Sequence, residues 1–332
     1  MKDFASCQLI LLDLCWVNSG FLDETFQKID YYLQQNKRII LIGCISNSIR
    51  ERYGNELYYI DSKNHVAVES YFEYKINLKK VESYSFKNKI SILDTDNDFK
   101  QYGELLGNFE SKSFIEISTW CEFNCSYCNI KKIKWATKSL AIQDIMDQVK
   151  EDFQQWKTDF YLLSDDCGSY GIDMGTTFVD LVEKIFSIHE SIRIYITNIN
   201  PVFFLKYYPS LKKYIFNGRI PYMLLPIQHT SPRILSLMKR WYSIDRLMEN
   251  LLDMRRNSKI ELCNHIIFNY FQETLEEFVD TLKLLQFYDK TFYFKYSDIN
   301  NIYGNDFESS DVKEKIILLK KLQHKYNIDI TI

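Results

Sequence analysis

The sequence predicts an α/β protein in which a small α/β domain precedes a partial (β/α)6 barrel. Two observations lead to this prediction. From Phe114 onward, apolar runs of strand length alternate with amphipathic segments of helix length, whereas the stretch before Phe114 has a different rhythm. Alternating strands and helices are typical of a parallel sheet covered by helices. A chain of 332 residues can hold two domains with sizeable cores.

The first domain is predicted to span residues 1–105. It begins with a strand over residues 8–14, a helix over residues 21–35 and a second strand over residues 38–43. Shorter mixed segments follow. The polar run over residues 94–98 has no apolar period, so it predicts the linker to the second domain.

The barrel is predicted to span residues 106–332 and to end in a helix. Its six strands are expected over residues 114–118, 160–164, 192–197, 220–226, 260–268 and 291–295. Helices are expected between them, among others over residues 139–156, 178–188, 233–256 and 275–285. Six such units describe a parallel, partly open barrel, and the functional side chains of parallel barrels lie at the C-terminal ends of the strands.

The loop after the first barrel strand carries three cysteines with an informative spacing. Cys121, Cys125 and Cys128 are separated by three and then two residues. Three thiols can hold three corners of a [4Fe-4S] cluster and leave the fourth iron open for S-adenosylmethionine (SAM), whereas four thiols would saturate the cluster. The motif therefore predicts radical SAM chemistry. An electron from the cluster cleaves SAM, and the resulting 5′-deoxyadenosyl radical takes a hydrogen atom from an unactivated carbon. A zinc site or three buried thiols is the alternative.

SAM also needs polar partners, and the ends of later strands offer them. Tyr127, beside the third cysteine, can shield the cluster and pack near the nucleoside. Asp165 is the first choice as acceptor for the SAM amino group and Asp166 the second, although an Asp pair in a turn is often only solvated. Thr197 and Asn198 close the third strand and can reach the ribose, although they also fit an ordinary turn.

Three later motifs resemble signatures of the radical SAM methylthiotransferase family, in the same order along the chain. They are Ser169-Tyr-Gly171, Leu225-Pro-Ile-Gln-His-Thr-Ser231 followed by Arg233-Ile-Leu-Ser-Leu-Met-Lys-Arg240, and Ile266-Ile-Phe-Asn-Tyr-Phe-Gln-Glu-Thr274. The resemblance implies a transferase with a [4Fe-4S] cluster and SAM, in a family that modifies tRNA or a ribosomal protein. It also implies that Gln228 and Arg240 lie near SAM and the substrate.

The N-terminal domain resembles that of the same family. Residues 11–15 and 39–44 carry this resemblance. The family's domain binds an auxiliary [4Fe-4S] cluster for sulfur transfer through three cysteines. Cys15 and Cys44 each close an apolar strand, so they are expected together at the C-terminal edge of a parallel sheet, where they are either cluster ligands or relics.

The third ligand of an auxiliary cluster has to come from elsewhere. Cys7 is unsuitable, because eight strand residues place it roughly 26 Å from Cys15. Cys167, in a loop expected at the mouth of the barrel, is the leading candidate, and otherwise it lines the pocket. Cys263 lies inside the fifth strand and is expected in the core.

The chain departs from the family pattern in three places. It begins where the family's second strand stands, so the first strand, the first helix and the first cysteine are expected to be missing. It stops at Ile332, without the family's C-terminal TRAM barrel. Residues 295–301 lack the proline, arginine and Gly-Thr that follow the Tyr-Ser pair. These departures predict a truncated member with a different substrate.

Charge and composition limit the partners. Lys and Arg number 41 against 44 Asp and Glu, which gives a net charge of −3 and a pI near 6.0. A basic surface for a polyanion such as tRNA is therefore not expected. No apolar run approaches the roughly 20 residues of a membrane span, and the N-terminus lacks a signal-peptide design. Eight cysteines, three of them in one motif, indicate reduced thiols and a cytoplasmic protein.

The sequence thus predicts a radical SAM enzyme that thiolates or methylthiolates a peptide or small metabolite, with a reductant such as flavodoxin or ferredoxin. Peptide crosslinking or epimerisation without sulfur insertion is the first alternative, and a non-catalytic iron–sulfur or zinc module is the second. Tyr170, Tyr270 and Tyr296 are expected at the mouth, where a substrate can lie against them. His229 is a pocket candidate, because a lone histidine is more often a satisfied hydrogen-bonding group than a base.

Overall fold

The computed structural model describes residues 9–14, 19–43, 45, 47–61, 112–128, 137–296 and 311–331. The chain divides into two compact units, Met1–Gly107 and Asn108–Ile332, each with its own apolar core. Cys7, Cys15, Cys44 and the predicted linker over residues 94–98 lie outside the described residues.

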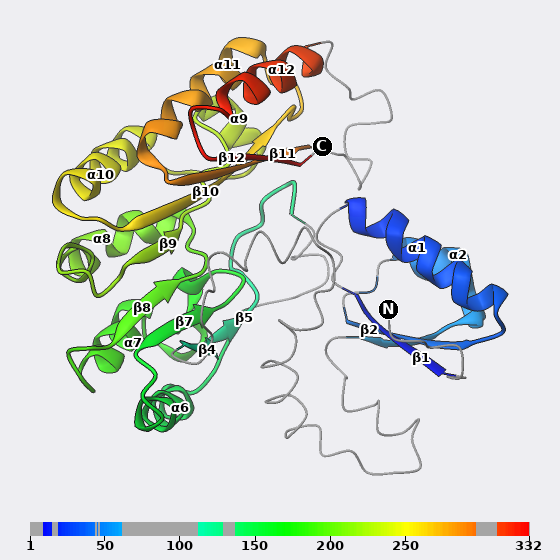
Figure 1. Cartoon of the computed structure of the whole chain (residues 1–332), viewed down its shortest axis with the longest axis horizontal. Helices are drawn as coiled ribbons and strands as arrows, with labels where there is room; N and C mark the ends of the chain where they lie inside the picture. The colour runs from blue at the N-terminus through cyan, green and yellow to red at the C-terminus, as the bar shows by residue number, and fades with distance from the viewer. Residues whose placement is uncertain are drawn as a thin grey trace. The chain divides into compact units, whose positions relative to one another are not determined.

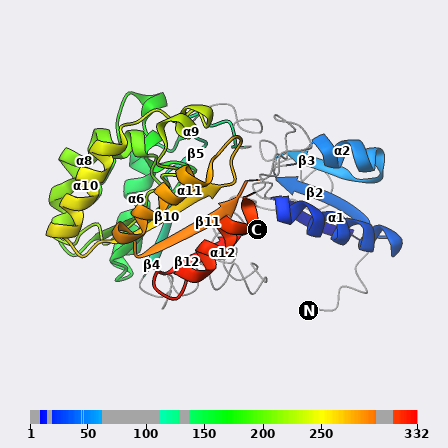
Figure 2. The same cartoon turned by 90° about the horizontal axis from the view of Figure 1, so that it is seen from above.

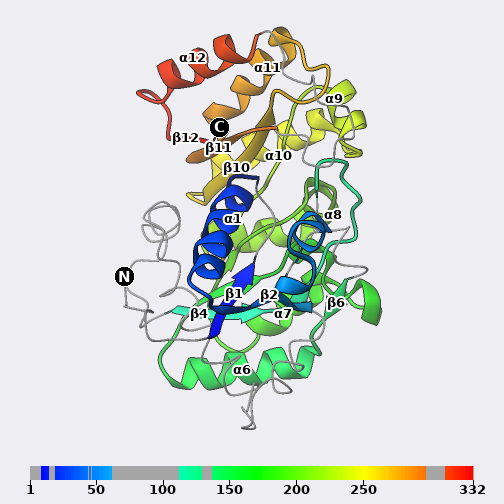
Figure 3. The same cartoon turned by 90° about the vertical axis from the view of Figure 1, so that its right-hand side faces the viewer.

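The first unit contains a three-stranded parallel sheet. β1 (Leu9–Leu14), β2 (Arg38–Gly43) and β3 (Tyr58–Asp61) pair in this order. α1 (Ser19–Gln34) joins β1 to β2, and α2 (Asn47–Tyr53) with the short 3-10 turn Gly54–Glu56 joins β2 to β3. Both helices lie over one face of the sheet (Figures 2 and 3). The two predicted strands and the predicted helix of this unit are confirmed to within two residues.

The second unit is built on a seven-stranded sheet whose neighbouring strands are all parallel. The strand order is β12-β11-β10-β9-β8-β7-β4 (Figure 1). The strands are β4 (Lys112–Glu116), β7 (Asp159–Leu163), β8 (Arg193–Ile196), β9 (Tyr222–Leu224), β10 (Glu261–Phe268), β11 (Lys290–Lys295) and β12 (Ile328–Thr331). The six predicted strands are confirmed. The seventh, β12, was missed because its four residues alternate apolar and polar side chains in a chain rich in such short runs.

Helices connect the strands and cover the outer face of this sheet (Figure 1). They are α6 (Ile142–Gln154), α7 (Phe178–Phe186), α8 (Pro201–Phe216), α9 (Pro232–Leu237), α10 (Ile244–Asn257), α11 (Leu275–Thr281) and α12 (Val312–Leu322), with 3-10 turns at Cys167–Ser169, Ile172–Met174 and Leu282–Phe287. Local signals start several of them. Thr177 and Thr274 each form a capping box, and Asn200 caps α8 ahead of Pro201.

Three predicted helices have different limits in the structure, and the one expected over residues 275–285 is α-helical only to Thr281, where a 3-10 turn follows. The segment over residues 233–256 is not one helix, because Lys239 takes a left-handed φ of 56° and Ser243 caps a new helix, so α9 ends before α10 begins. The helix predicted from residue 139 starts at Ile142. The preceding pair, β6 (Lys138–Ser139), instead forms an antiparallel ladder with β5 (Ser118–Thr119).

The inner face of the sheet carries a row of aromatic side chains in register. Phe114, Tyr161, Tyr195 and Tyr222 follow one another on β4, β7, β8 and β9. The ring centroids of successive members lie 4.9, 4.2 and 6.3 Å apart. Farther along the sheet His265 meets two phenylalanines edge to face, and burial lowers its pKa to about 4. His265 is therefore neutral at physiological pH.

None of the described helices is both long enough and apolar enough to cross a membrane.

Candidate active site

The loops after the parallel strands lie at one edge of the sheet, because parallel strands all end on the same side. The loop after β4 carries the three cysteines and is held first by the loop after β7. The Trp120 N–H donates to Asp165 Oδ2 at 2.7 Å, and the hydroxyls of Ser118 and Ser164 are 2.8 Å apart. Trp120 itself has a φ of 76°, which turns the chain into the cysteine motif.

The far end of the cysteine loop is held by the other side of the barrel. The Ser126 N–H donates to the Met238 carbonyl at 3.1 Å, and the Ser126 hydroxyl donates to the Leu237 carbonyl at 2.7 Å. The same hydroxyl lies 2.7 Å from the hydroxyl of Tyr270, which follows β10. The loop therefore reaches from β7 to the ends of α9 and β10, and its main chain is fixed without use of the thiols.

The three cysteines of this loop are not joined in disulfides. Cys125 is 8% exposed, while Cys121 and Cys128 are partly exposed. Cys121 Sγ lies 4.0 Å from Asp166 Oδ2, and burial, followed by this negative charge, raises the pKa of Cys121. Within the described ranges, no three His, Cys, Asp or Glu side chains are grouped around a single metal position.

A buried cation lies beside the motif. Arg240 is 6% exposed, and its guanidinium donates to Cys125 Sγ at 3.8 Å, to the Tyr127 hydroxyl at 3.0 Å and to the Pro226 carbonyl at 2.7 Å. Burial by itself would lower the pKa of Arg240, but the nearby Tyr127, Tyr242 and Cys125 outweigh it, and the pKa is raised. Three thiols with a fixed positive charge beside them fit an anionic thiolate-ligated cluster.

The residues predicted to bind SAM make different hydrogen bonds in the structure. The Asp165 carboxylate accepts from Trp120, and its carbonyl accepts from the Asn198 amide. Asp166 is 2% exposed and accepts from Ser169 Oγ at 2.7 Å, the Asn200 N–H at 2.9 Å and the Gly168 N–H at 3.1 Å. These donors lie on the loops after β7 and β8, so the Asp166 carboxylate joins the two loops.

Thr197 is used in a similar way. Its hydroxyl donates to the Leu162 carbonyl at 2.6 Å. Gln228 is 8% exposed and pairs through its main chain with β10, accepting from the Ile267 N–H at 3.0 Å and donating to the His265 carbonyl at 2.9 Å. Its side-chain oxygen stays available.

The expectation that Cys167 lies open at the mouth as a cluster ligand is not supported by its position. Cys167 is fully buried in the apolar core, and its thiol donates to the Leu162 carbonyl at 3.4 Å. Burial raises its pKa to about 12, so the thiol is protonated. Cys263 is 1% exposed and lies within β10, as predicted.

The tyrosines expected to line the mouth are packed instead. Tyr170 is fully buried, and its hydroxyl donates to the Leu140 carbonyl at 3.1 Å. Tyr270 and Tyr296 are 1% and 7% exposed, and their rings are inclined at 61° with centroids 4.6 Å apart. Tyr270 therefore supports the cysteine loop through Ser126, and none of the three tyrosines offers an open surface.

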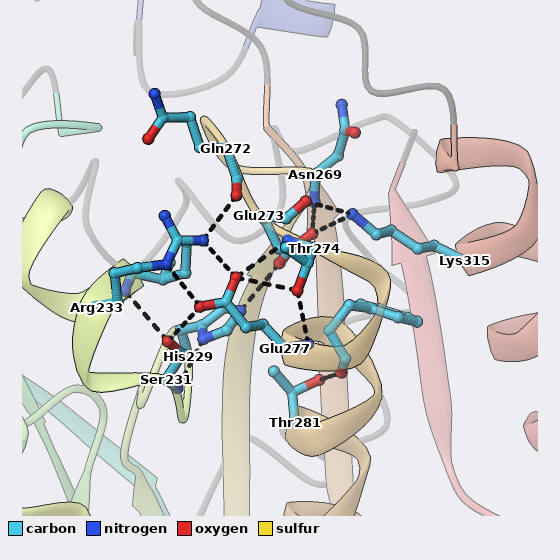
Figure 4. Close-up of polar contacts among 12 residues, drawn as sticks. His229, Ser231, Arg233, Asn269, Gln272, Glu273, Thr274, Glu277, Thr281 and Lys315 are labelled. Carbon is cyan, nitrogen blue, oxygen red and sulfur yellow. Dashed lines mark hydrogen bonds and ion pairs between the residues drawn. The ribbon is translucent and has the colours of Figure 1, made fainter.

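A buried charged network that sequence reasoning missed lies at the ends of β9 and β10. His229 Nε2 is 3.0 Å from Glu273 Oε1, and the Lys315 ammonium is 2.7 Å from Glu273 Oε2 (Figure 4). All three side chains are completely buried. His229 Nδ1 accepts from the Ser231 N–H at 2.9 Å, so Nε2 carries the proton that is shared with Glu273. We call these three residues the His–Glu–Lys clamp.

The chain belongs to the radical SAM superfamily, whose family model matches residues 115–285. Within that class it is similar to methylthiotransferases, as the sequence motifs predicted. It is 26% identical over 297 residues to the threonylcarbamoyladenosine tRNA methylthiotransferase of Homo sapiens, covering 86% of this chain and 50% of that relative. It is 23% identical over 342 residues to the ribosomal protein uS12 methylthiotransferase RimO of Histophilus somni, covering 95% of this chain and 73% of that relative. The chain thus spans about half the length of the human relative.

Replacing Arg240 tests whether the buried guanidinium supports the cysteine motif. Arg240→Gln removes the charge beside Cys125 and leaves the Tyr127 hydroxyl and Pro226 carbonyl short of donors. We expect the free energy of unfolding to fall by about 2–3 kcal/mol. We also expect less iron per chain after anaerobic reconstitution. Arg246→Gln, on the exposed face of α10, is the control and should change neither measurement. Equal iron in both variants would contradict a supporting role for Arg240.

Proposed function

We propose that this protein is a methylthiotransferase-like radical SAM enzyme. The observation that supports it best is the placement of Cys121, Cys125 and Cys128 on a loop at the C-terminal edge of the parallel sheet, beside the buried Arg240. When bound there, a [4Fe-4S] cluster would supply the electron that cleaves SAM to methionine and a 5′-deoxyadenosyl radical, which then takes a hydrogen atom from the substrate.

The residues of the chain would prepare this site in separate ways. The three thiols would hold the cluster, and Arg240 would balance its negative charge and keep Tyr127 against it. Asp165 would keep the start of the loop in place and remains the candidate acceptor for the SAM amino group. Asn198 and Gln228 would offer amide oxygens to SAM from the ends of β8 and β9.

We propose sulfur insertion, as thiolation or methylthiolation, as the outcome of the reaction. The relatives are named as methylthiotransferases, and β1 and β2 run parallel and end in register, with Leu14 opposite Gly43. Cys15 and Cys44 directly follow these two residues in the sequence. We therefore propose them as two ligands of an auxiliary [4Fe-4S] cluster. The buried position of Cys167 makes it the weaker part of that proposal.

We propose a peptide or a small metabolite as the substrate. The tRNA and uS12 named for the relatives are macromolecules, whereas the net charge of −3 offers little attraction to a polyanion. A one-electron donor such as flavodoxin or ferredoxin is the expected protein partner, in the cytoplasm. Radical modification of a peptide without sulfur insertion is the alternative if the auxiliary cluster is absent.

The central proposal predicts that SAM cleavage depends on the three cysteines. The triple variant Cys121→Ala, Cys125→Ala, Cys128→Ala, reconstituted with iron and sulfide and reduced with dithionite, should form no 5′-deoxyadenosine from SAM. Cys263→Ala removes a buried thiol from β10 and should keep the activity. Cleavage by the triple variant would show that the assignment is wrong.

The auxiliary cluster predicts a stepwise loss of iron. The wild-type protein should bind about eight irons per chain, and Cys15→Ala or Cys44→Ala should bind about four. Both variants should still cleave SAM without inserting sulfur. Cys7→Ala is the control for a thiol outside the predicted ligand set. Cys167→Ala should keep its iron if the buried thiol is structural. Equal iron and unchanged electron paramagnetic resonance spectra in all four variants would exclude the auxiliary cluster.

The substrate proposal predicts weak binding to folded RNA. Phosphate contacts from Lys and Arg supply much of the affinity of RNA-binding proteins, so we expect no complex with bulk tRNA tighter than about 1 μM at physiological salt. A filter-binding titration at several salt concentrations measures this. A nanomolar complex that weakens steeply as salt is added would make tRNA the better candidate.

A further inference from the structure

Three neighbouring strands end in amide side chains that have an unpaired oxygen. Asn198 follows β8, Gln228 follows β9 and Asn269 follows β10, and these strands are adjacent in the sheet. In the described part of the chain, Asn198 Oδ1, Gln228 Oε1 and Asn269 Oδ1 are buried without a hydrogen-bond partner. A buried acceptor that is left unpaired destabilises the fold, so three of them at the ends of adjacent strands indicate a ligand that brings donors.

Gln228 and Asn269 both have a left-handed backbone conformation, which is strained for Gln228 and better tolerated by Asn269. Their φ angles are 73° and 58°, in the left-handed region that side chains other than glycine rarely adopt. Gln228 is 8% exposed and Asn269 is 1% exposed. Glycine would take the left-handed conformation at position 228 without strain, so the Gln228 side chain needs a role that outweighs the strain.

The hydrogen bonds and ion pair of the His–Glu–Lys clamp hold Gln228 and Asn269 in this conformation. Glu273 accepts from the Asn269 N–H at 2.6 Å and from His229, the residue directly after Gln228. Lys315 of α12 balances the charge of Glu273, and Asp311 lies 3.1 Å from the same ammonium. In Figure 4 the Asn269 side chain points away from the clamp, while its N–H points toward Glu273. The clamp therefore fixes the main chain and leaves the amide free for a ligand.

We propose that Asn269 is a specificity-determining residue whose amide oxygen, beside that of Gln228, accepts hydrogen bonds from the donor groups of SAM. This inference rests on the proposed function. SAM carries two ribose hydroxyls as donors, which suit a row of acceptors, besides the amino group for which Asp165 is the candidate acceptor. The carboxylate of SAM would be repelled by such a row and belongs elsewhere in the site. Asn269 is thus a binding residue, and the clamp residues position it.

The clean variant is Asn269→Gly, because glycine keeps the left-handed conformation and removes only the amide. Gln272→Gly is the matched control. Gln272 lies in the same turn, has a φ of 59° and is exposed. Both proteins are reconstituted anaerobically, and the dissociation constant for SAM is measured by equilibrium dialysis, without any activity assay. Melting temperatures without SAM are recorded for both.

We expect Asn269→Gly to weaken SAM binding about 10-fold, as loss of one buried hydrogen bond does. Gln272→Gly should bind SAM as the wild type does, and both variants should melt within a few degrees of it. Equal SAM affinity in Asn269→Gly and the wild type would overturn the inference and leave Asn269 to a substrate. If Asn269→Gly does not fold, Asn269→Ser, whose side chain is shorter and lacks the amide, gives the same comparison. A wild-type protein that holds its cluster but binds no SAM would refute the proposed function itself, which is a distinct result.

Discussion

The cysteine loop is fixed at both ends by hydrogen bonds that do not involve its thiols. Asp165 accepts from the main chain of Trp120 at one end, and Ser126 bonds to Leu237 and Tyr270 at the other. An open sheet cannot set the distance between its first and later strands by strand pairing alone. The cysteine loop spans this distance and is held by hydrogen bonds to the turns that follow several strands. The geometry of the cysteines therefore depends on the whole barrel. This explains why the aromatic side chains around the loop are packed and not exposed.

The buried charges at the strand ends contribute little to the stability of the fold, but they fix the positions of the turns around them. Placing Glu273 and Lys315 together in a site with no solvent exposure gains less than an apolar pair of the same shape would give. The carboxylate, however, accepts from three donors on different elements, namely His229, Asn269 and Lys315. An apolar pair could pack there, but it could not accept hydrogen bonds and so could not favour one backbone conformation of these turns over another. Orientation of the turns after β9 and β10 is the property that the charges supply.

The sequence alone predicted the features that depend on neighbouring residues in the chain. It did not predict the features that depend on contacts between residues far apart in the chain. The strands of the barrel are contiguous apolar runs, and the cysteine motif lies within eight residues, so both were found. Asp166 and Thr197 were expected to bind SAM because their residue types suit it, and the structure adds that their polar atoms bond to neighbouring main chain. Asn269 was overlooked, since neither its left-handed φ nor its unpaired oxygen can be read from residue type. Lys315 was overlooked because a lysine on an amphipathic helix normally faces water.

The position of Lys315 has a consequence for the order in which the protein is made. Its partner Glu273 lies 42 residues earlier in the chain. A ribosome therefore releases the carboxylate well before the ammonium that neutralises it, and until then a buried Glu273 would be an unpaired charge. The nascent barrel can gather its first strands, but the ends of β9 and β10 cannot close around Glu273 until α12 has emerged. The turns after β9 and β10 can therefore reach their final packing only after α12 has been synthesised, although both turns are made well before it.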